Sequence, residues 1–294
     1  MDTEGIKTDV VLVTGASAGL GLAISHRLIQ TGHRLILTAR SESMQRFVEA
    51  GIEDGERIWL RPLDVTHEAD RRQVIAEADA KWGGIDVLIN NAGVAYRAVV
   101  EHVQDSERRA QMDVNFRGPM ELVRLVLPGM RRKRYGRIIN LSSVGGMMAM
   151  PTMAVYSASK FALEGATEAL WYEVRPWNIK VSLIQPGFIH SNSFERTRYT
   201  ELSTRASVSE EDPYFAHYLH MTNFIRRCMQ TASSTSDDVA KVVLKTMQRK
   251  NPPLRIAGTM DAWLFGAMRR LLPRRLYHEV LYRGLPKVGT WGRR

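Results

Sequence analysis

The chain has 294 residues, of which 44% are hydrophobic and 24% are charged, and its formal net charge is +10. These values are ordinary for a globular protein, and the length suits one large α/β domain. They exclude a membrane span, because no run approaches about eighteen apolar residues, and an intrachain disulfide, because Cys228 is the single cysteine. The polar start, Met1 to Asp9, does not resemble a signal or transit peptide. We expect a cytoplasmic protein, with peripheral membrane contact left open.

Apolar strand-like runs alternate with amphipathic segments through the first two thirds of the chain. We predict strands at 10–13, 34–38, 57–61, 86–89, 137–141 and 179–184. Helices are predicted between them, at 20–31, 42–50, 67–81, 105–133 and 155–175. This alternation indicates an α/β fold, a Rossmann-type doubly wound parallel sheet in three layers. Ligands of such sheets bind beyond the carboxyl ends of the strands.

The last third has a looser pattern. Residues 192–212 are polar and predicted to be irregular, 213–229 resemble a helix, and another helix is predicted from Ser236. We therefore divide the chain into a dinucleotide-binding catalytic domain at 1–253, with a variable substrate lid at 188–235, and a C-terminal helical extension at 254–294. That extension is basic and amphipathic, and it is expected to pack on the same domain or on a partner.

A glycine-rich turn follows the first predicted strand. Val10 to Val13 lead directly into Thr14-Gly15-Ala16-Ser17-Ala18-Gly19-Leu20-Gly21, after which apolar residues recur at helical spacing. Glycines let the backbone approach a pyrophosphate, and a helix N-terminus offers free N–H groups to it. The spacing Gly-x-x-x-Gly-x-Gly differs from the general Gly-x-Gly-x-x-Gly fingerprint. The turn predicts a dinucleotide site, with an ordinary surface turn as the alternative.

Tyr156 and Lys160 are the candidate proton-transfer pair. Four residues apart on a predicted helix, they lie on one face, about one turn from each other. A free phenol titrates near pH 10, and a neighbouring ammonium lowers that pKa. Ser143 lies thirteen residues before Tyr156. The pattern predicts a tuned proton donor and acceptor.

Five motifs in this order resemble those of the short-chain dehydrogenase/reductase family, in its single-domain branch. They are Thr14-Gly15-x-x-x-Gly19-x-Gly21, Asn90-Asn91-Ala92-Gly93, Asn115, Ser143 with Tyr156 and Lys160, and Pro186-Gly187. The resemblance is close over about residues 8 to 192 and looser through Ala240. Within this family, the chain resembles members that act on steroid, retinoid or other lipophilic carbonyls.

The resemblance implies catalytic roles for four residues. Tyr156 exchanges a proton with the substrate oxygen, and Lys160 lowers the pKa of Tyr156 and holds the nicotinamide ribose. Ser143 hydrogen-bonds the substrate oxygen where charge develops. Asn115 holds a water that links Lys160 to solvent. Ser142, Ser157 and Ser159 are alternative serines by composition, and the spacing to Tyr156 favours Ser143.

The resemblance also implies a set of cofactor contacts. They are Gly15, Ser17, Gly19, Leu20, Gly21, Arg40, Asp64, Val65, Asn91, Ala92, Gly93, Tyr156, Lys160, Pro186, Gly187, Ile189 and Ser191. For Asp64 a turn-capping role is equally open. Ser191 stands where relatives often have a threonine that bonds the carboxamide.

Arg40 decides the expected cofactor. The second strand ends without the carboxylate that NAD-preferring enzymes use for the ribose 2′-hydroxyl, and Arg40 offers a fork suited to the 2′-phosphate of NADP. We therefore expect NADP(H). His217 and His220 lie three apart with no third ligand in view, so no metal site is expected.

The substrate is expected to be lipophilic. The loop between Ser143 and Tyr156 contains four methionines, which make an adaptable apolar wall, with core packing as the alternative. Aromatic residues of the lid are expected to line a large pocket: Phe194, Tyr199, Tyr214, Phe215, Tyr218 and Phe224. The expected function is NADP(H)-dependent hydride transfer to or from a lipophilic ketone, aldehyde or secondary alcohol. The alternatives are an NAD-dependent alcohol dehydrogenase and a catalytically idle NADP-binding scaffold.

The C-terminal extension is strongly basic. From Arg269 to Arg294 there are eight lysines and arginines and one acid, Glu279. A basic amphipathic helix can lie on a membrane surface, cover its own substrate pocket or pack on a partner subunit, and these readings stay open. No nucleic-acid-binding motif accompanies the charge, so nucleic acid is not expected as a partner. The family resemblance implies a homodimer or homotetramer.

Overall fold

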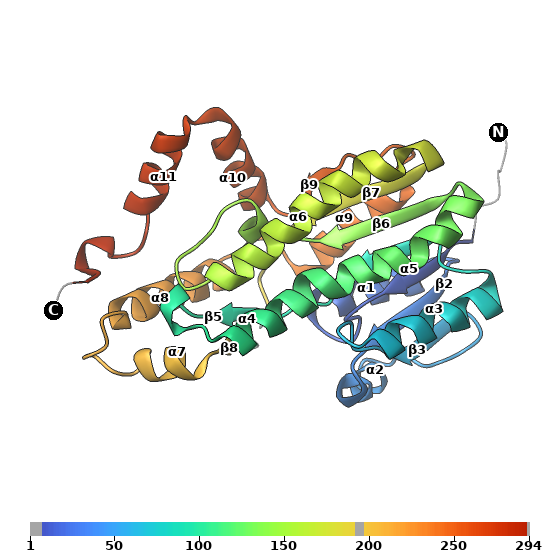
Figure 1. Ribbon diagram of the computed structural model, residues 1–294, viewed down its shortest axis with the longest axis horizontal. Coiled ribbons are helices and arrows are strands. Elements are labelled where there is room, and N and C mark those ends of the chain that lie inside the picture. The colour runs from blue at the N-terminus through green and yellow to red at the C-terminus, as the bar shows by residue number, and fades with distance from the viewer. Residues whose placement is uncertain (1–7, 192–196, 293–294) are drawn as a thin grey trace.

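A parallel sheet forms the centre of the molecule in a computed structural model, which describes residues 8–191 and 197–292 (Figure 1). Within these residues the sheet has seven strands in the order β3-β2-β1-β4-β6-β7-β9. The strands are β1 (Val10–Val13), β2 (Arg34–Ala39), β3 (Ile58–Pro62), β4 (Val87–Asn90), β6 (Gly136–Leu141), β7 (Ile179–Gln185) and β9 (Arg255–Ala257). All neighbouring pairs are parallel. The predicted doubly wound fold is confirmed.

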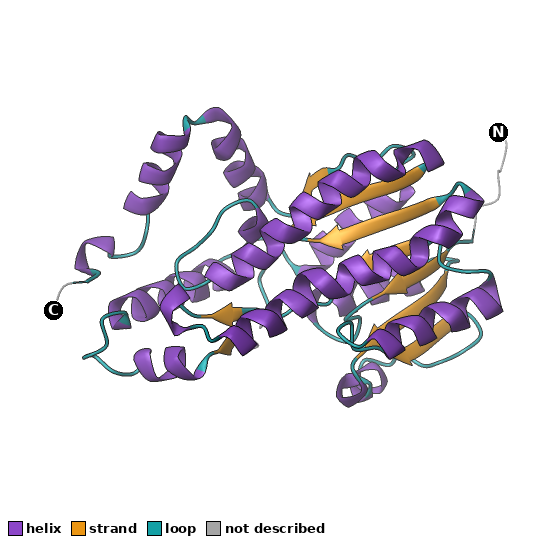
Figure 2. Ribbon diagram, viewed as in Figure 1, coloured by secondary structure: helices purple, strands orange, loops and turns teal. Residues whose placement is uncertain are grey.

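Helices cover both faces of the sheet, which gives three layers (Figure 2). The helices are α1 (Gly19–Ile29), α2 (Gln45–Glu49), α3 (Glu68–Trp82), α4 (Asp105–Met112), α5 (Gly118–Lys133), α6 (Ala154–Val174), α7 (Glu201–Ala206), α8 (Phe215–Gln230), α9 (Ser236–Gln248), α10 (Met260–Leu271) and α11 (Arg274–Arg283). Because side chains alternate along a strand, Val10 and Leu12 of β1 join the core under α3, α5 and α6. Val11 and Val13 join the core under α1 and α9.

Four elements differ from the predictions. The seventh strand, β9, was not predicted, because three residues give too short a pattern to read and its paired residues in β7 are 72 positions earlier in the chain. A two-stranded ribbon, β5 (Tyr96–Arg97) with β8 (Arg198–Tyr199), was missed for the same reason. Helix α7 replaces part of the predicted irregular segment, and the Thr200 side chain caps it by accepting from the Ser203 N–H.

The predicted helix at 105–133 is continuous but not uniform. A π-helical segment (Asp113–Arg117) separates α4 from α5, and Asn115 lies within it. A π-helical turn inserts an extra residue into the helix and turns its side chains, and such turns are frequent at functional sites. Pattern analysis sees only the average helical period, so it does not reveal this turn.

The C-terminal extension packs against the methionine-rich loop. Tyr277 of α11 is buried with Val144, Met147 and Met148, and Phe265 and Met268 of α10 pack against them. Several large apolar side chains on the other faces of these helices stay exposed, among them Trp263, Leu264 and Leu271. Among the described residues there is no helix long and apolar enough to cross a membrane.

Candidate active site

The glycine-rich turn lies where β1 meets α1. Gly15 adopts a φ of +63° and Gly19 a φ of +55°, in the left-handed region that favours glycine. A Cβ atom on Gly21 would lie 2.0 Å from the Gly15 carbonyl oxygen, so a side chain there cannot be accommodated without backbone movement. The start of α1 carries no acidic side chain in its first turn. The turn therefore presents bare backbone and a helix N-terminus, the arrangement that fits a pyrophosphate.

Two side chains hold this turn in place. The Thr14 hydroxyl accepts hydrogen bonds of 3.0 Å from the Asn91 and Ala92 N–H groups. The Asn91 amide donates to the carbonyls of Thr14 and Gly15, each at 3.0 Å. The Asn91 side chain thus shapes the cofactor turn, and its amide hydrogens are both directed at that turn's backbone.

Arg40 lies beside the same turn. The Ala16 N–H donates to the Thr38 carbonyl at 2.8 Å, which ties the glycine turn to the end of β2 two residues before Arg40. The Arg40 side chain is half exposed and forms an ion pair of 3.0 Å with Glu42. A surface pair of this kind contributes little stability, so the guanidinium remains available to a phosphate at this edge.

Asp64 and Val65 follow β3 on the same side of the sheet. The Asp64 carboxylate accepts from the Thr66 N–H at 2.8 Å and from the Thr66 hydroxyl at 2.7 Å, which lowers the pKa of Asp64 although its burial acts in the opposite direction. With these hydrogen bonds Asp64 caps the turn, which is the alternative role that the sequence left open for it. The Val65 side chain belongs to the core, and its carbonyl accepts from Arg71 at 2.7 Å. In the glycine-rich turn, Ser17 is buried, and Leu20 at the start of α1 packs on the core below that helix.

The predicted proton-transfer residues come together at the start of α6. Tyr156 and Ser143 line one cavity, and a hydrogen bond links the two side chains. The Lys160 ammonium lies 6.0 Å from the centre of the Tyr156 ring and donates to the Leu141 carbonyl at 2.8 Å. Leu141 is the last residue of β6, so this hydrogen bond to the sheet fixes the position of Lys160, one helical turn after Tyr156.

Burial determines the charge state of both residues. Removal from water raises the pKa of Tyr156, and the hydrogen bond with Ser143 opposes that rise. Burial likewise lowers the pKa of Lys160 to about 8, although the Glu164 carboxylate acts to raise it. The sequence predicted a tyrosine with a lowered pKa. Here the effect of desolvation is the larger one, so Tyr156 is a phenol at neutral pH.

Asn115 joins the catalytic helix to the segment after β4. Its side chain is fully buried and accepts from the Val94 N–H at 2.8 Å. Its amide donates to the Val94 carbonyl at 2.8 Å and to the Ser159 hydroxyl at 2.9 Å. Ser159 lies between Tyr156 and Lys160 in the sequence. Asn115 therefore positions α6 relative to Gly93, in the turn predicted to contact the cofactor.

Two residues of the C-terminal extension hydrogen-bond to the Pro186-Gly187 turn and the residue after it. The sequence did not predict either of them. The Thr259 hydroxyl accepts from the Gly187 N–H at 2.8 Å, and the Asp261 carboxylate accepts from the Phe188 N–H at 2.8 Å. The Pro186 carbonyl accepts from the Val144 N–H at 2.7 Å, next to Ser143. Only the fold shows this, because Asp261 is 73 residues from its partner.

The other predicted contacts after that turn lie nearby. Ile189 packs on the core beside α9, and the Ser191 hydroxyl lies 3.4 Å from the Ile189 carbonyl, to which it donates. His190 is exposed, and its Nδ1 atom lies 3.0 Å from the Gln230 carbonyl oxygen.

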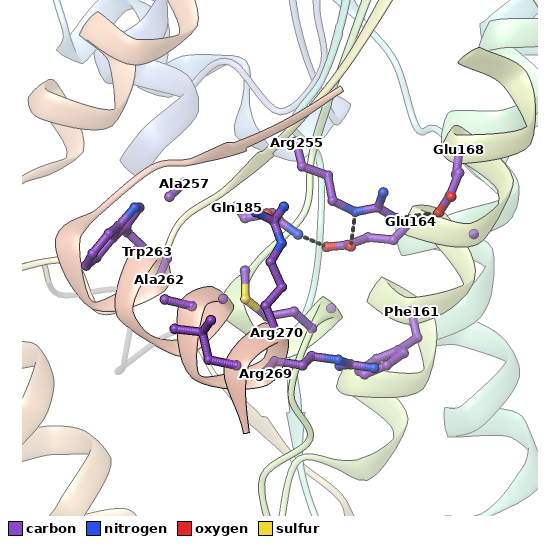
Figure 3. A pocket seen from close by; sticks show the side chains of 16 residues that line it. Phe161, Glu164, Glu168, Gln185, Arg255, Ala257, Ala262, Trp263, Arg269 and Arg270 are labelled. Carbon is purple, nitrogen blue, oxygen red and sulfur yellow. Dashed lines mark hydrogen bonds and ion pairs between the residues drawn. The ribbon is translucent and has the colours of Figure 1, made fainter. Parts of the chain in front are cut away.

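Glu164 is a second group that sequence reasoning missed. One helical turn beyond Lys160, it is 6% exposed. It accepts from the Ser142 hydroxyl at 2.7 Å and from the Gln185 amide at 2.8 Å, and Arg255 of β9 pairs with it at 3.5 Å (Figure 3). A signal was present, since an acid eight residues after Tyr156 falls on the face of the helix that carries Lys160.

The cavity beside Ser143 and Tyr156 has a volume of about 150 Å³. Its walls come from the loop after β6, from α6, from the Pro186-Gly187 turn and from α8. The lining residues are Arg97, Ser143, Val144, Gly145, Met150, Met153, Tyr156, Ser157, Gly187, Phe188, Ile189, Ile225 and Met229. Most of this wall is apolar.

Five of the six aromatic residues predicted to line the pocket do not line this cavity, whereas another aromatic residue of the lid, Phe188, does. None of the five that the structure describes is among its lining residues, and Phe194 lies outside the described residues. Tyr218 is instead buried, with its hydroxyl 2.9 Å from His102 Nδ1. The methionines divide between two roles: Met150 and Met153 line the cavity, whereas Met147 and Met148 pack in the core with Tyr277.

A larger cleft of about 840 Å³ borders the loop that follows Ser143, through Gly146 and Met147, and Figure 3 shows the side chains that line it. It is bounded by α6, β9 and α10, with Phe161, Glu164, Arg255 and Trp263 among its walls. Ser143 and Tyr156 are not among the residues that line it. The smaller cavity is therefore the one that meets the proton-transfer groups.

Comparison with known proteins agrees with this geometry. Residues 9–202 match the family described as short chain dehydrogenase. The chain is 33% identical over 277 residues to a 3-ketodihydrosphingosine reductase of Bacteroides thetaiotaomicron, covering 94% of this chain and 97% of the relative.

Solved structures give the same result. A short-chain dehydrogenase from Streptomyces avermitilis has a TM-score of 0.77 and 31% identity, covering 95% of this chain and 99% of that one. The closed form of a serine dehydrogenase complexed with NADP+ has a TM-score of 0.67 and 27% identity, covering 84% and 94%. The chain therefore belongs to the short-chain dehydrogenase/reductase family and is an oxidoreductase that transfers a hydride to or from CH–OH and C=O groups with a nicotinamide nucleotide.

Proposed function

We propose that this chain is an NADP(H)-dependent oxidoreductase acting on a lipophilic ketone, aldehyde or secondary alcohol. The observation that carries the proposal is the placement of Ser143 and Tyr156 in the wall of a largely apolar cavity. The two hydroxyl groups can therefore hydrogen-bond the oxygen of an apolar substrate that occupies the cavity.

Tyr156 is suited to giving a proton to the oxygen of the substrate. Burial raises its pKa, so the phenol is protonated at neutral pH and can act as the acid of a carbonyl reduction. The Ser143 hydroxyl accepts from the Gly145 N–H at 3.1 Å, which holds it beside Tyr156, where it can hydrogen-bond the same oxygen. A bound nicotinamide nucleotide supplies or accepts the hydride.

Lys160 contributes a nearby positive charge. Its ammonium favours the phenolate that remains on Tyr156 after proton transfer, even though burial lowers the pKa of the lysine to about 8. Asn115 and Leu141 fix the helix and the ammonium in place. We propose that the glycine-rich turn binds the pyrophosphate of the cofactor and that the Pro186-Gly187 turn contacts its nicotinamide.

Arg40 supports NADP(H) over NAD(H). It lies next to the glycine turn and carries a charge that a 2′-phosphate can bind, while its surface partner Glu42 can exchange for that phosphate. The serine dehydrogenase solved with NADP+, named above, is consistent with this choice.

The apolar lining supports a lipophilic substrate. Val144, Met150 and Met153 form one wall, and Ile225 and Met229 of α8 form the other. The relative from Bacteroides thetaiotaomicron is named for 3-ketodihydrosphingosine. A carbonyl compound with an apolar body is therefore the proposed substrate.

The test is absorbance at the nicotinamide band while the purified protein is mixed with NADPH or NADH and a panel of apolar ketones, aldehydes and alcohols. Turnover with NADPH that disappears in Tyr156→Phe is the expected result. Turnover only with NADH would overturn the cofactor assignment. NADPH binding without turnover of any substrate on the panel would favour the idle scaffold.

A further inference from the structure

One face of α10 is apolar and open to solvent. Four large side chains on it are each at least 51% exposed: Met260, Trp263, Leu264 and Leu271. Residues three, four, seven or eight apart lie on one side of a helix, so these four form a stripe along α10. Single apolar side chains are normal on a protein surface, whereas a continuous apolar patch marks a site of interaction.

The opposite side of α10 holds the helix on the protein. Ala262 is buried, and Phe265 and Met268 pack with Met147 of the loop after Ser143. The exposed stripe therefore does not serve to hold α10 in place, and its apolar surface is open to a partner.

Positive charge accompanies the stripe. The C-terminal arm, which we define as α10 and α11 (residues 260–283), contains five arginines and two acids. Asp261 already accepts from the Phe188 N–H at 2.8 Å, and Glu279 forms an ion pair of 2.7 Å with Arg283. The acids of the arm therefore leave most of its arginines without a counter-charge.

Three of these arginines lie close to the end of the stripe. Arg270 directly precedes Leu271, which is 80% exposed, and Arg274 and Arg275 begin α11. All three are exposed, and none forms an ion pair with another described residue. Figure 1 shows α10 and α11 at one edge of the molecule, with the turn between them at the outer end. The arm thus presents apolar side chains together with positive charge.

This combination fits the surface of an anionic lipid bilayer. An amphipathic helix with tryptophan and leucine on one side and arginine beside them lies in the membrane interface, where the apolar side chains enter the acyl region and the cations meet lipid phosphates. A second copy of this chain on the same surface would bring like charges together, which opposes association. Charge complementarity therefore favours the lipid surface.

The arm is also joined to the candidate substrate cavity. The Asp261 carboxylate of α10 holds the N–H of Phe188, which lines that cavity with Tyr156. Tyr277 of α11 packs on Val144, which lines the same cavity. Docking of the arm therefore fixes the position of the cavity relative to the bilayer.

We propose that the C-terminal arm docks on the surface of an anionic lipid bilayer, with the apolar stripe among the acyl chains and the arginines on the lipid headgroups. The docking depends on this surface and not on catalysis. One consequence rests on the proposed function: a lipophilic substrate dissolved in the bilayer meets the enzyme at the membrane surface.

Sedimentation with vesicles tests the docking. The full-length protein, without cofactor, is mixed with vesicles of phosphatidylcholine alone and with vesicles that contain about one third phosphatidylserine. We expect binding to the anionic vesicles to be at least about tenfold tighter and to weaken with added salt. Absence of binding to the anionic vesicles would overturn the proposal.

The apolar stripe is tested by a double variant. Leu264→Gln/Leu271→Gln should weaken vesicle binding about 10- to 100-fold, because two apolar side chains no longer enter the bilayer. Val48→Gln, at an exposed apolar position of α2, should bind as the wild type does. Because all three side chains are exposed, the variants should fold, which circular dichroism checks. Unchanged binding of the double variant would show that the stripe does not insert.

The arginines are tested in the same way. Arg270→Gln/Arg274→Gln should weaken binding to the anionic vesicles about 10- to 30-fold. Arg46→Gln/Arg132→Gln removes the same charge from exposed positions of α2 and α5 and should leave binding nearly unchanged. Equal losses in the two pairs would show that net charge alone attracts the protein to vesicles, and the docking surface would be rejected.

Two further outcomes separate the alternatives. If vesicles are not bound and Leu264→Gln/Leu271→Gln lowers the molar mass measured by light scattering, the stripe belongs to a second copy of the chain and the proposal fails. If vesicles are bound through the arm but no carbonyl or alcohol is turned over, the proposed function fails and the docking stands. If substrates are turned over and vesicles are not bound, the docking fails alone.

Discussion

Ser142 donates a hydrogen bond of 2.7 Å from its hydroxyl to the Glu164 carboxylate, and the Gln185 amide donates to the same oxygen at 2.8 Å. Ser142 immediately precedes Ser143, and Gln185 immediately precedes Pro186. A single buried carboxylate on the catalytic helix therefore holds both the loop that carries Ser143 and the turn proposed to contact the nicotinamide.

Replacing Glu164 should harm both stability and turnover. Glu164→Ala leaves the buried Ser142 hydroxyl and Gln185 amide without their acceptor, which should lower the free energy of unfolding by about 3 kcal/mol. The kcat should fall more than the KM changes, because Ser143 loses its support. Glu164→Gln, which keeps an acceptor oxygen, should restore part of kcat. Urea unfolding and steady-state kinetics measure these effects.

Glu168→Ala is the control for that experiment. Glu168 also pairs with Arg255, at 2.7 Å, but on the exposed side of α6. A surface pair contributes about 0 to 1 kcal/mol, so this change should be nearly silent. Equal effects of the two substitutions would contradict a positioning role for Glu164.

Tyr156→Phe should remove turnover but not cofactor binding. Loss of a positioned general acid lowers kcat by about 10² to 10⁴. Tyr172→Phe, at a position of α6 that is 62% exposed, should leave kcat unchanged. Substrate turnover followed by absorbance and NADPH binding followed by fluorescence give the two readings. A Tyr156→Phe protein with more than a tenth of wild-type kcat would show that another group transfers the proton.

The kcat/KM for carbonyl reduction should fall as pH rises through about 8. Burial lowers the pKa of Lys160 to about 8, so the ammonium is present below that pH and lost above it. The pKa of Tyr156 is raised, so the phenol keeps its proton through this range. The profile of kcat/KM reports the free enzyme, to which this lysine pKa belongs.

Lys160→Arg gives the matching control for the pH profile. A guanidinium keeps its charge to far higher pH, so the fall near pH 8 should disappear even if the maximal rate is lower. A wild-type profile that stays flat from about pH 7 to 9.5 would contradict the assignment of Lys160 as the titrating group.

Gly21→Ala should disrupt the cofactor turn. A Cβ at Gly21 would lie 2.0 Å from the Gly15 carbonyl oxygen and 2.5 Å from the Asn91 amide nitrogen, so the backbone must move. Such overpacking costs about 1–3 kcal/mol of unfolding free energy, and NADPH affinity should fall at least about tenfold. Gly32→Ala, where no atom lies within 4 Å of the added carbon, should change neither. Isothermal titration with NADPH decides between these outcomes.

Arg40→Ala should reduce the preference for NADPH over NADH. Loss of the charge-assisted contact with a 2′-phosphate should lower the ratio of kcat/KM values by about 10- to 100-fold. Arg46→Ala, on the exposed face of α2, should leave the ratio unchanged. If Arg40→Ala weakens both cofactors equally, Arg40 does not read the 2′-phosphate.

Short-range signals explain why much of the fold could be predicted. The six predicted strands are short, mostly apolar runs, and segments of helical length lie between them. The two strands of the ribbon β5–β8 and the strand β9 have two or three residues each, too few for a period. They form because distant backbone supplies their hydrogen bonds: the Leu183 N–H of β7, for example, donates to the carbonyl of Leu254, just before β9, at 2.6 Å.

By itself, the sequence determined which residues are the candidates for the chemistry, because their spacing is local: Tyr156 and Lys160 share a helix face, and the glycines follow directly on β1. Only the tertiary structure decided what surrounds them. Burial at the meeting of sheet, loop and lid raises the pKa of Tyr156 and lowers that of Lys160. Contacts across many residues bring Glu164, Asp261 and Arg97 to the site, and desolvation and long-range contacts leave no periodic mark in a sequence.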